Sequence, residues 1–567
     1  MQTKQLHLTK WLVLATFFGL AAFASVQSSP TQKPTQDSDS ARSMQDRDIN
    51  RDELARFDQF LDSHREIAEQ LRRDPSLANN RQFVKNHPAL QDYLRDHPET
   101  REAFRSDPRL FMNDEAQSNT AGFASLLGRP LVESIWRRRT HRVSRGVPML
   151  KAGSMTYSSK QTPLPLSELE EAVLIAISGH TGVTMPDRPF QDPISGDFIM
   201  AKPNLTMHGR SAGSPDNAQG TSFFMINDSG TYFIKKLPSG NQQFPPTPQT
   251  LIDRARLAKV KLLDHRVDTK DRDFPAYLDS NRFLSNLPGT TIFFPVVDLS
   301  HQYINGLMYL LTQPKGHRPT LVDDRNFYRN AGVDKWVRNG FLNPDIKLPL
   351  SQVGTLRTHI EADLLLQNLM LVADAMGLGA YIHASIGPPV LLGDPKFTAQ
   401  YGKMLGFEFA TPRFKLLDIM RWQVLLPRLA NLRAHPVGLK VGDEYLIKAK
   451  CPSYYSNMKA TVEEVIAGKF GSNGIYKDSA MFAQIYKDGY GATYMKEASD
   501  YDTDVIDCAT DICNYIYETH GRFPAHVDAI HVPGVWLQVH HLDIEYYDKY
   551  FRDGLTDAHR QHDSHWH

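Results

Sequence analysis

The sequence predicts an α+β protein in which a helical N-terminal appendage precedes a larger domain and a mixed C-terminal extension follows it. Two apolar runs, 222–226 and 231–234, flank the tight turn Asn-Asp-Ser-Gly and indicate an antiparallel hairpin. Segment 365–379 is apolar around most of a helical circumference, which is typical of a buried helix. Between residues 51 and 112, apolar side chains recur at helical spacing. These observations favour helices combined with a mostly antiparallel sheet.

The composition is that of a multidomain globular protein. With 567 residues, the chain is long enough for two or three domains. Its 64 basic and 64 acidic side chains cancel, and 41% of its residues are hydrophobic. Because a balanced charge gives no electrostatic reason to bind a polyanion, we expect no nucleic-acid partner.

Residues 1–26 have the pattern of a signal peptide. Lys4 and Lys10 precede an apolar run from 11 to 26, and this run contains small residues that suit a signal peptidase, namely Ala22, Ala24 and Ser25. We therefore expect an exported protein, periplasmic or extracellular. The alternative is an N-terminal membrane anchor, although this run is shorter than the roughly 20 residues that span a bilayer.

Residues 27–50 predict a disordered tether, because Ser, Thr, Pro, Gln and Asp dominate and almost nothing is apolar. Residues 51–125 predict an appendage of short helices, in which each Asp-Pro or His-Pro pair supplies a cap and a first-turn proline. Part of the appendage repeats after 33 residues: His64, Ile67, Pro75 and Leu77 return as His97, Thr100, Pro108 and Leu110. Partner binding, a spacer role and simple packing on the main domain all stay open.

Residues 126–410 form the predicted main domain, and an arginine-rich motif lies near its start. RRRTHRVSR spans 137–145 and holds five arginines in nine positions. A solvated charged face is the common explanation of such a run. The same residues also suit a phosphate site, since the guanidinium forks of Arg138 and Arg142 and the hydroxyl of Thr140 can converge on one dianion.

Three further segments follow in order along the chain. Segment 165–174 begins a helix at Ser167, and Glu170 three residues later completes a capping box. The loop Arg210-Ser211-Ala212-Gly213 comes next, just before the predicted hairpin. The buried helix 365–379 comes last, and its two glycines, Gly377 and Gly379, predict a left-handed stop.

In this order, the four segments resemble the FMN-binding nitroreductase superfamily, and are most similar to its SagB-like dehydrogenase branch. RRTHR is similar to the motif that holds the FMN phosphate and ribityl chain, and 365–379 resembles the central helix. The resemblance implies a nitroreductase-like flavin fold, FMN as cofactor, a homodimer, and oxidoreductase activity on a small molecule with an unidentified electron donor or acceptor. It implies no catalytic side chain. The residues it implies for FMN binding are Arg138, Arg139, Thr140, Arg142, Ser211, Ala212, Gly213, Gln367, Ala384 and Ser385.

Two departures from the family pattern support an alternative. Arg210 stands where the family has a proline before the serine, and 382–385 hold no glutamate where the family presents a small or acidic residue to the flavin. The alternative is a non-catalytic protein of this fold that serves as a binding or structural module of the cell envelope, because a shared fold does not guarantee activity.

A serine hydrolase is a weaker alternative. Gly209 to Gly213 fits G-x-S-x-G, which would make Ser211 a covalent nucleophile. That motif requires a buried strand before the serine and a helix after it. Here Pro203 interrupts the preceding run and Pro215 follows, so the context disfavours this alternative.

The C-terminal extension, 411–567, is rich in aromatic residues and histidine. Eight of the 22 histidines lie between 526 and 567: His526, His531, His540, His541, His559, His562, His565 and His567. Together with Asp543, Asp557 or Asp563, they offer zinc-ligand chemistry. Their spacing matches no defined motif, so we assign no metal ligand, expect surface or packing histidines, and expect the tail to be dispensable for FMN binding.

The chain has only three cysteines, Cys451, Cys508 and Cys513, which are too few for a disulfide framework. Cys508 and Cys513 are five positions apart. On one helix they would point to different faces, so we expect free or buried thiols.

Overall fold

The computed structural model describes residues 120–567 apart from 188–202, 239–244, 268–276, 279–280, 354, 385–386, 413–426, 430–431 and 499, together with 80–98 and scattered positions between 57 and 101. The predicted signal peptide and tether lie outside the described residues. The chain divides into two compact units, 1–114 and 115–567. This boundary precedes the predicted one after residue 125, because α6 (Thr120–Gly128) packs on helices of the second unit.

The continuously described part of the first unit, residues 80–98, includes the helices α3 (Arg81–Asn86) and α4 (Pro88–Asp96). Pro88 occupies the first turn of α4, as predicted, but the His87 side chain does not cap that helix. Its Nδ1 lies 2.9 Å from the Phe83 carbonyl oxygen instead. Three histidine rings contact an aromatic ring four residues earlier, each with centroids 4.3 Å apart: Phe60–His64 and Tyr93–His97, which are stacked, and Phe83–His87, which is tilted. The repeat pair His64 and His97 therefore makes equivalent local contacts.

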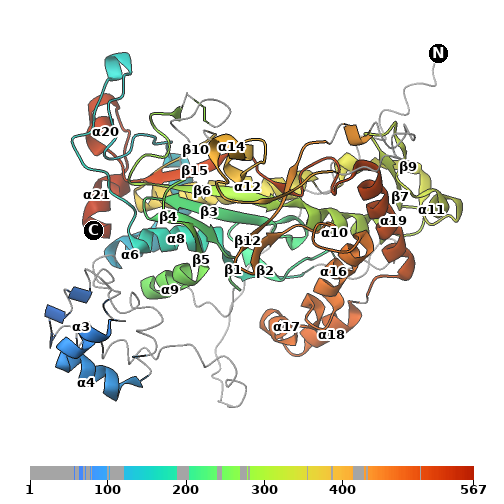
Figure 1. The fold of residues 1–567 in the computed structure, drawn as a ribbon, viewed down its shortest axis with the longest axis horizontal. Coiled ribbons are helices and arrows are strands. Elements are labelled where there is room, and N and C mark those ends of the chain that lie inside the picture. The colour runs from blue at the N-terminus through green and yellow to red at the C-terminus, as the bar shows by residue number, and fades with distance from the viewer. Residues whose placement is uncertain are drawn as a thin grey trace. The chain divides into compact units, whose positions relative to one another are not determined.

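The second unit is built on one antiparallel sheet (Figure 1) with the strand order β10-β15-β6-β3-β4-β5, and β14 also pairs with β6. The predicted hairpin is confirmed, since Asn227 of β3 lies opposite Gly230 of β4. The strands are β3 (Thr221–Asn227), β4 (Gly230–Ile234), β5 (Lys259–Leu263), β6 (Thr290–Asp298), β10 (Gly379–His383), β14 (Ile530–His531) and β15 (Trp536–His540).

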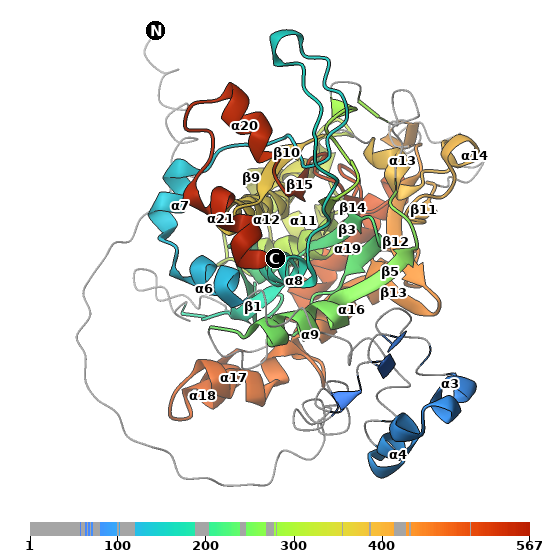
Figure 2. The same cartoon turned by 90° about the vertical axis from the view of Figure 1, so that its left-hand side faces the viewer.

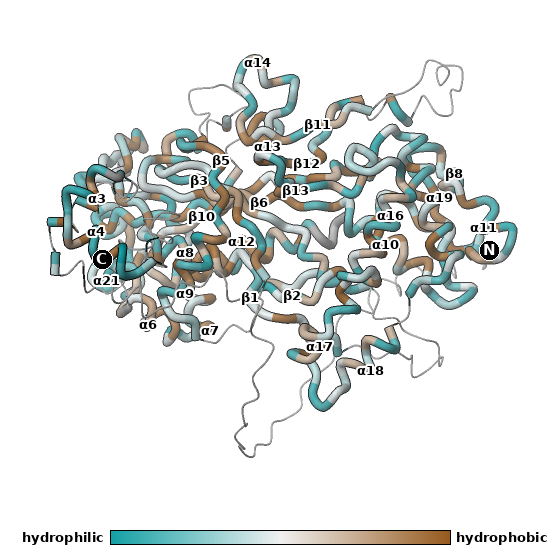
Figure 3. Tube along the Cα trace, turned by 60° about the horizontal axis from the view of Figure 1, so that its bottom comes forward, coloured by the Kyte–Doolittle hydropathy of each residue, from teal (hydrophilic) through white to brown (hydrophobic). Residues whose placement is uncertain are grey.

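Helices cover both faces of this sheet, because alternate side chains of a strand point to opposite faces. Phe223 and Met225 of β3 pack in one core with α8 (Glu168–Ser178), α9 (Pro248–Ala258) and α12 (Thr355–Met376). Phe224 and Ile226 pack in the other core with α10 (Leu299–Leu311), α16 (Met458–Phe470) and α19 (Thr503–His520). Figure 3 shows hydrophobic segments gathered around β6 and along parts of α12.

Smaller sheets and short helices surround this core. β1 (His180–Val183) pairs with β2 (His208–Arg210). Two three-stranded sheets have the orders β8-β7-β9 and β11-β12-β13. Their strands are β7 (Pro319–Asp323), β8 (Arg329–Asn330), β9 (Asn343–Pro349), β11 (Glu408–Ala410), β12 (His435–Val441) and β13 (Glu444–Lys448). The short helices are α7 (Leu131–Arg137), α11 (Asp334–Arg338), α13 (Pro388–Leu392), α14 (Thr398–Tyr401), α17 (Ser479–Ile485), α18 (Tyr490–Glu497), α20 (Ile544–Tyr550) and α21 (Asp557–Trp566).

The C-terminal extension is part of the main domain. β15 lies inside the large sheet, between β10 and β6. Further along, α21 packs on α6 and α12, and Figure 2 shows the C-terminal end beside α6 and α8. The residues after 410 therefore belong to the same compact unit as the main domain, because strand pairing joins segments that are far apart along the chain.

α12 confirms the predicted helix and begins ten residues earlier, at Thr355. Gly377 has a φ of 91°, as a left-handed stop requires. Gly379 differs from the prediction, since it is the first residue of β10 and is not among the glycines with positive φ. A Cβ there would collide with the side chains of His540 and Leu542, so strand packing is the reason for this glycine.

Among the described residues, no helix has both the length and the hydropathy that crossing a bilayer requires. All three cysteines are buried free thiols, as predicted. Burial raises the pKa of Cys508 and of Cys513 above the ordinary value.

Candidate functional site

The predicted arginine site lies at the C-terminal end of α7. Arg138 follows this helix directly, and its Nη1 donates to Thr140 Oγ1 at 3.3 Å. The same nitrogen lies 3.7 Å from Met370 Sδ on α12. The Arg142 guanidinium lies 6.0 Å from the centre of the Tyr381 ring on β10. The structure thus brings Arg138 and Thr140 together, and places Arg138 beside α12 and Arg142 beside β10.

The outer arginines of the motif have acidic partners. Arg137 pairs with Glu133 at 2.9 Å, and Arg145 pairs with Asp563 at 3.2 Å. These contacts explain two of the five charges as ordinary ion pairs. They leave three guanidiniums in the centre of the motif to be explained.

The three central arginines, Arg138, Arg139 and Arg142, form no ion pair with any carboxylate in the described part of the chain. Arg139 Nη1 donates to the carbonyl oxygens of Trp136, Arg137 and Arg138 at 3.1–3.3 Å, so it caps the end of α7. Arg138 is half-buried and Arg142 is exposed. These two side chains therefore present uncompensated positive charge to a ligand.

The predicted Ser211 loop is held by contacts to α8 and α12. Ser211 Oγ donates to the Ile177 carbonyl oxygen at 2.9 Å, and Asn368 Nδ2 donates to the Ser211 carbonyl oxygen at 2.7 Å. Arg210 is fully buried and pairs with Glu361 of α12 at 3.2 Å. Burial lowers the pKa of Arg210 to about 10, and Glu361 opposes this shift. The arginine that replaces the expected proline is therefore a structural anchor of the loop.

These contacts disfavour the hydrolase alternative. β2, the strand before Ser211, has three residues, and the loop is followed by the single turn Pro215–Asn217 in place of a helix. Among the described residues, Ser211 Oγ contacts the Ile177 carbonyl and the Asn368 amide, and no histidine or carboxylate. A serine nucleophile needs such a base.

The arginines and the Ser211 loop flank the exposed face of α12. Side chains on a helix advance by about 100° per residue. Viewed along the axis of α12, Asn368 and Met370 are therefore about 160° apart, and Gln367 lies in the sector between them. Gln367 is exposed. Ile360 and Leu364, which are 53% and 44% exposed, project into the same sector. The sequence predicted a buried helix that is apolar around most of its circumference. In the structure α12 is buried on that side and open along one stripe.

The other predicted cofactor residues lie in the Ser211 loop, just after β10, or outside the described part. Ala212 packs against the core that contains α8 and α12, and a side chain at Gly213 would meet open space. The Ala384 carbonyl, just after β10, accepts from Asn281 Nδ2 at 3.2 Å. Ser385 lies outside the described residues. Among the described residues, no direct interaction links the Ser211 loop to the arginines.

A largely apolar cavity of about 500 Å³ adjoins Ser211. Its walls come from α6, α8 and α9, with Val372 of α12 beside them. Its volume lies in the range of small-molecule sites, and three basic side chains border it, namely His180, Lys235 and Arg254. Burial lowers the pKa of His180 to about 3, which keeps that ring neutral at pH 7. The cavity therefore offers a largely apolar space next to the Ser211 loop.

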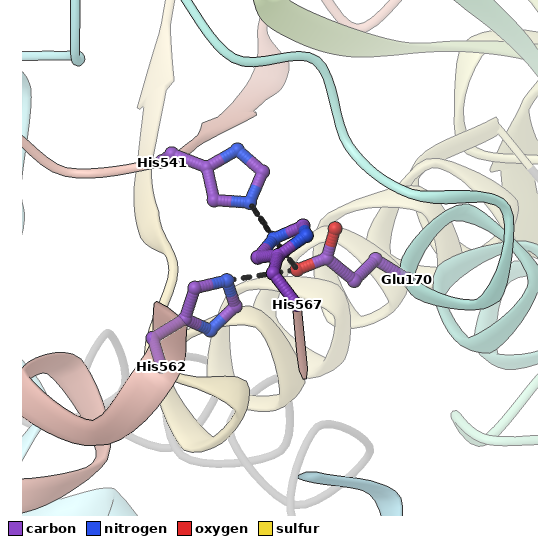
Figure 4. Close-up of side chains that lie close together, drawn as sticks. All are labelled: Glu170, His541, His562 and His567. Atoms are coloured by element: carbon purple, nitrogen blue, oxygen red, sulfur yellow. Dashed lines mark hydrogen bonds and ion pairs between the residues drawn. The ribbon is translucent and has the colours of Figure 1, made fainter. Parts of the chain in front are cut away.

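A second group of polar side chains is buried at the first turn of α8 (Figure 4). Glu170 Oε2 accepts from the Ser167 backbone N–H at 2.6 Å, which completes the predicted capping box. Glu170 Oε1 faces three histidines: it lies 3.3 Å from Nε2 of His541, 2.8 Å from Nε2 of His562 and 3.8 Å from Nε2 of His567.

The carboxylate of Glu170 and the neighbouring rings shift each other's pKa values. Burial opposes ionisation of Glu170, but hydrogen bonds from His541 and His562 hold its pKa below the ordinary value. Burial also opposes protonation of His562, but the Glu170 carboxylate raises the pKa of that ring. The two directions agree on an ionic contact between Glu170 and His562.

Sequence reasoning missed this group. It expected surface or packing histidines and offered Asp543, Asp557 and Asp563 as their acidic partners. In the structure, Asp543 accepts from the Tyr157 hydroxyl at 2.7 Å and Asp563 pairs with Arg145. The carboxylate that meets the histidines comes from α8, and the only local signal at Glu170 was its role as a helix cap.

Comparison with known proteins finds no matching family model and no matching curated protein. A crystal structure of a nitroreductase, so named provisionally, from Ralstonia eutropha JMP134 matches with a TM-score of 0.22 and 14% identity. The match covers 48% of this chain and 76% of that chain. A likeness this low supports no inference about fold or activity.

Proposed function

We propose that the chain is an exported FMN-dependent oxidoreductase of the nitroreductase or SagB-like dehydrogenase type, acting on a small molecule. The observation that carries this proposal is the pair Arg138 and Arg142, which stands without an acidic partner among the described residues beside the open stripe of α12. Two guanidinium forks next to a hydroxyl suit a phosphate dianion. The signal-like first 26 residues support export.

The residues fit the cofactor in two respects. Arg138, Thr140 and Arg142 would hold the phosphate, since their donors are free of competing carboxylates in the described structure. The Ser211 loop and Gln367, on the open stripe, would hold the ring system. When bound, FMN supplies hydride transfer, and the protein's part is to bind and orient it. We assign no side-chain acid or base.

The exposed apolar residues of α7 and α12 support a homodimer. Leu131, Val132 and Trp136 of α7 are 66%, 63% and 79% exposed. α7 packs on α12, whose Ile360 and Leu364 are also exposed. Apolar side chains gathered on one surface mark a place where another protein binds. A second copy of the chain would cover them beside the proposed flavin site.

The test is the double substitution Arg138→Ala with Arg142→Ala. Charge-assisted hydrogen bonds contribute about 1.5–3 kcal/mol each, so we expect FMN affinity to fall by about two orders of magnitude or more. Titration of FMN fluorescence measures this loss. The matched control is Arg137→Ala with Arg145→Ala, which removes the same charge from two arginines that already have acidic partners, and should leave affinity within about threefold.

Each outcome decides between the alternatives. If the wild-type protein showed no FMN binding at millimolar FMN, the oxidoreductase proposal would fail and the non-catalytic binding module would replace it. If both double variants bound FMN equally well, the phosphate would lie elsewhere.

A further inference from the structure

The group of Glu170, His541, His562 and His567 has the composition of a metal centre. Its four ligand atoms all lie within 4.8 Å of one another. The side chains of Glu170, His541 and His562 are 0%, 1% and 5% exposed, and that of His567 is 29% exposed. Figure 4 shows the three rings and the carboxylate pointing at one centre.

The hydrogen bonds of two rings decide which nitrogen faces that centre. Nδ1 of His541 lies 2.8 Å from the Leu164 carbonyl oxygen, and Nδ1 of His562 lies 2.8 Å from the Met376 carbonyl oxygen. A carbonyl oxygen only accepts, so both Nδ1 atoms carry hydrogen. In a neutral ring, Nε2 then presents its lone pair to the centre. Metal-binding histidines are oriented in this way by their other nitrogen.

The ligand atoms crowd around one point. Glu170 Oε1 lies 2.8 Å from Nε2 of His562 and 3.3 Å from Nε2 of His541, and Nε2 of His541 lies 3.0 Å from Nε2 of His567. A cation at the centre would contact all four atoms at once.

The spacing of the ligand atoms fits a tetrahedral ion. Bonds of about 2.0–2.1 Å place tetrahedral ligands about 3.3 Å apart. The separations within the group include 2.8, 3.0, 3.3 and 3.8 Å, which bracket that value.

A neighbouring group on α21 shows the opposite arrangement. His141, Asp374 and His559 are also close together and buried. The Thr556 backbone N–H donates to Nδ1 of His559 at 3.0 Å, so Nε2 of that ring carries the hydrogen and points at Asp374 Oδ1, 3.6 Å away. This nitrogen offers no lone pair. The second group therefore lacks a lone pair from His559 and is not a candidate metal centre.

We infer that Glu170, His541, His562 and His567 bind one divalent transition-metal ion, for which zinc is the best match. Three imidazoles and one carboxylate form a ligand set that zinc accepts in four-coordinate sites. Because the protein supplies all four ligands, the ion is structural. It ties the first turn of α8 to the segment after β15 and to α21.

The test measures zinc binding by the full chain after metal has been removed with a chelator. We expect one zinc ion per chain, and one cobalt ion with the visible absorption of a tetrahedral site. His567→Ala changes the least buried ligand and should weaken zinc binding about tenfold or more. The matched control is His565→Ala, two residues earlier on α21 and outside the group, which should bind zinc as the wild type does.

A second variant, Glu170→Gln, keeps an amide oxygen for the Ser167 cap and removes the charge, so it should also lose affinity. Circular dichroism checks that each protein is folded. A folded wild-type chain that binds no zinc at micromolar concentration would overturn the inference. Zinc binding that is equal in the wild type, His567→Ala and Glu170→Gln would overturn it as well. Neither result depends on whether the chain binds FMN.

Discussion

The arginine pair Arg138 and Arg142 and the histidine group around Glu170 place charge in opposite surroundings. The two arginines come from one short loop and are half-buried or exposed, so water can screen their charge until an anion arrives. The histidine group draws on residues from 170 to 567 and is mostly buried. A buried charge must be balanced within the protein, since leaving it unpaired is costly. An exposed charge can therefore remain unpaired until a ligand binds, whereas a buried charge needs a partner of opposite charge within the protein.

The largest expected effect concerns the buried ion pair between Arg210 and Glu361. Glu361→Ala leaves the Arg210 guanidinium buried without its carboxylate and frees the Ser214 hydroxyl, which now donates to Glu361 at 2.5 Å. Removing one partner of a buried pair costs about 3–5 kcal/mol, and we expect that loss in the free energy of unfolding measured in urea. Glu133→Ala is the control, because its pair with Arg137 is exposed and contributes less than about 1 kcal/mol. Similar losses from both substitutions would contradict the contrast between buried and exposed charge.

A smaller effect is expected on the pH dependence of stability. It concerns His383, a buried histidine that, unlike His562, has no carboxylate partner among the described residues. His383 of β10 is buried, stacks on Tyr381 at 4.6 Å, and neither ring nitrogen has a hydrogen bond among the described residues. Burial lowers its pKa from 6.5 to about 3. Between these values the unfolded chain binds a proton that the folded chain does not, so stability falls as the pH drops from 6.5 towards 3.

His383→Phe should remove this contribution, which amounts to about 1.4 kcal/mol per pH unit inside that window. The free energy of unfolding, compared at pH 7 and pH 5, measures the change in slope. The two proteins should differ little in their dependence above pH 6.5. An unchanged slope between pH 7 and pH 5 would show that the ring is hydrated or paired in solution.

The smallest effect is expected at Arg139, which the family resemblance assigns to the cofactor. In the structure its guanidinium caps α7 by binding three carbonyl oxygens. Arg139→Ala should therefore change FMN affinity by about twofold or less, as expected for a surface substitution that touches no ligand. A loss as large as that of Arg138→Ala, measured by the same titration, would return Arg139 to the phosphate site.

Local signals predicted much of the architecture. The hairpin, the capping box at Ser167 and the stop at Gly377 are all confirmed, because each depends on residues only a few positions apart. The arginine motif was visible for the same reason. The role of Gly379 was misjudged, since the side chains that require a glycine there belong to His540 and Leu542, more than a hundred residues away.

For the candidate sites as well, features set by neighbouring residues were predictable from the sequence, and contacts between distant segments were not. Side-chain spacing within a helix or turn follows from backbone geometry, so the residue order alone indicated the helices, the hairpin and the exposed arginines. The partner of a buried group depends on which strands pair and which helices pack, and these contacts join segments whose separation along the chain carries no information about distance. Folding alone therefore decided that β15 lies inside the large sheet between β10 and β6, and that a capping glutamate of α8 meets three histidines from the far end of the chain.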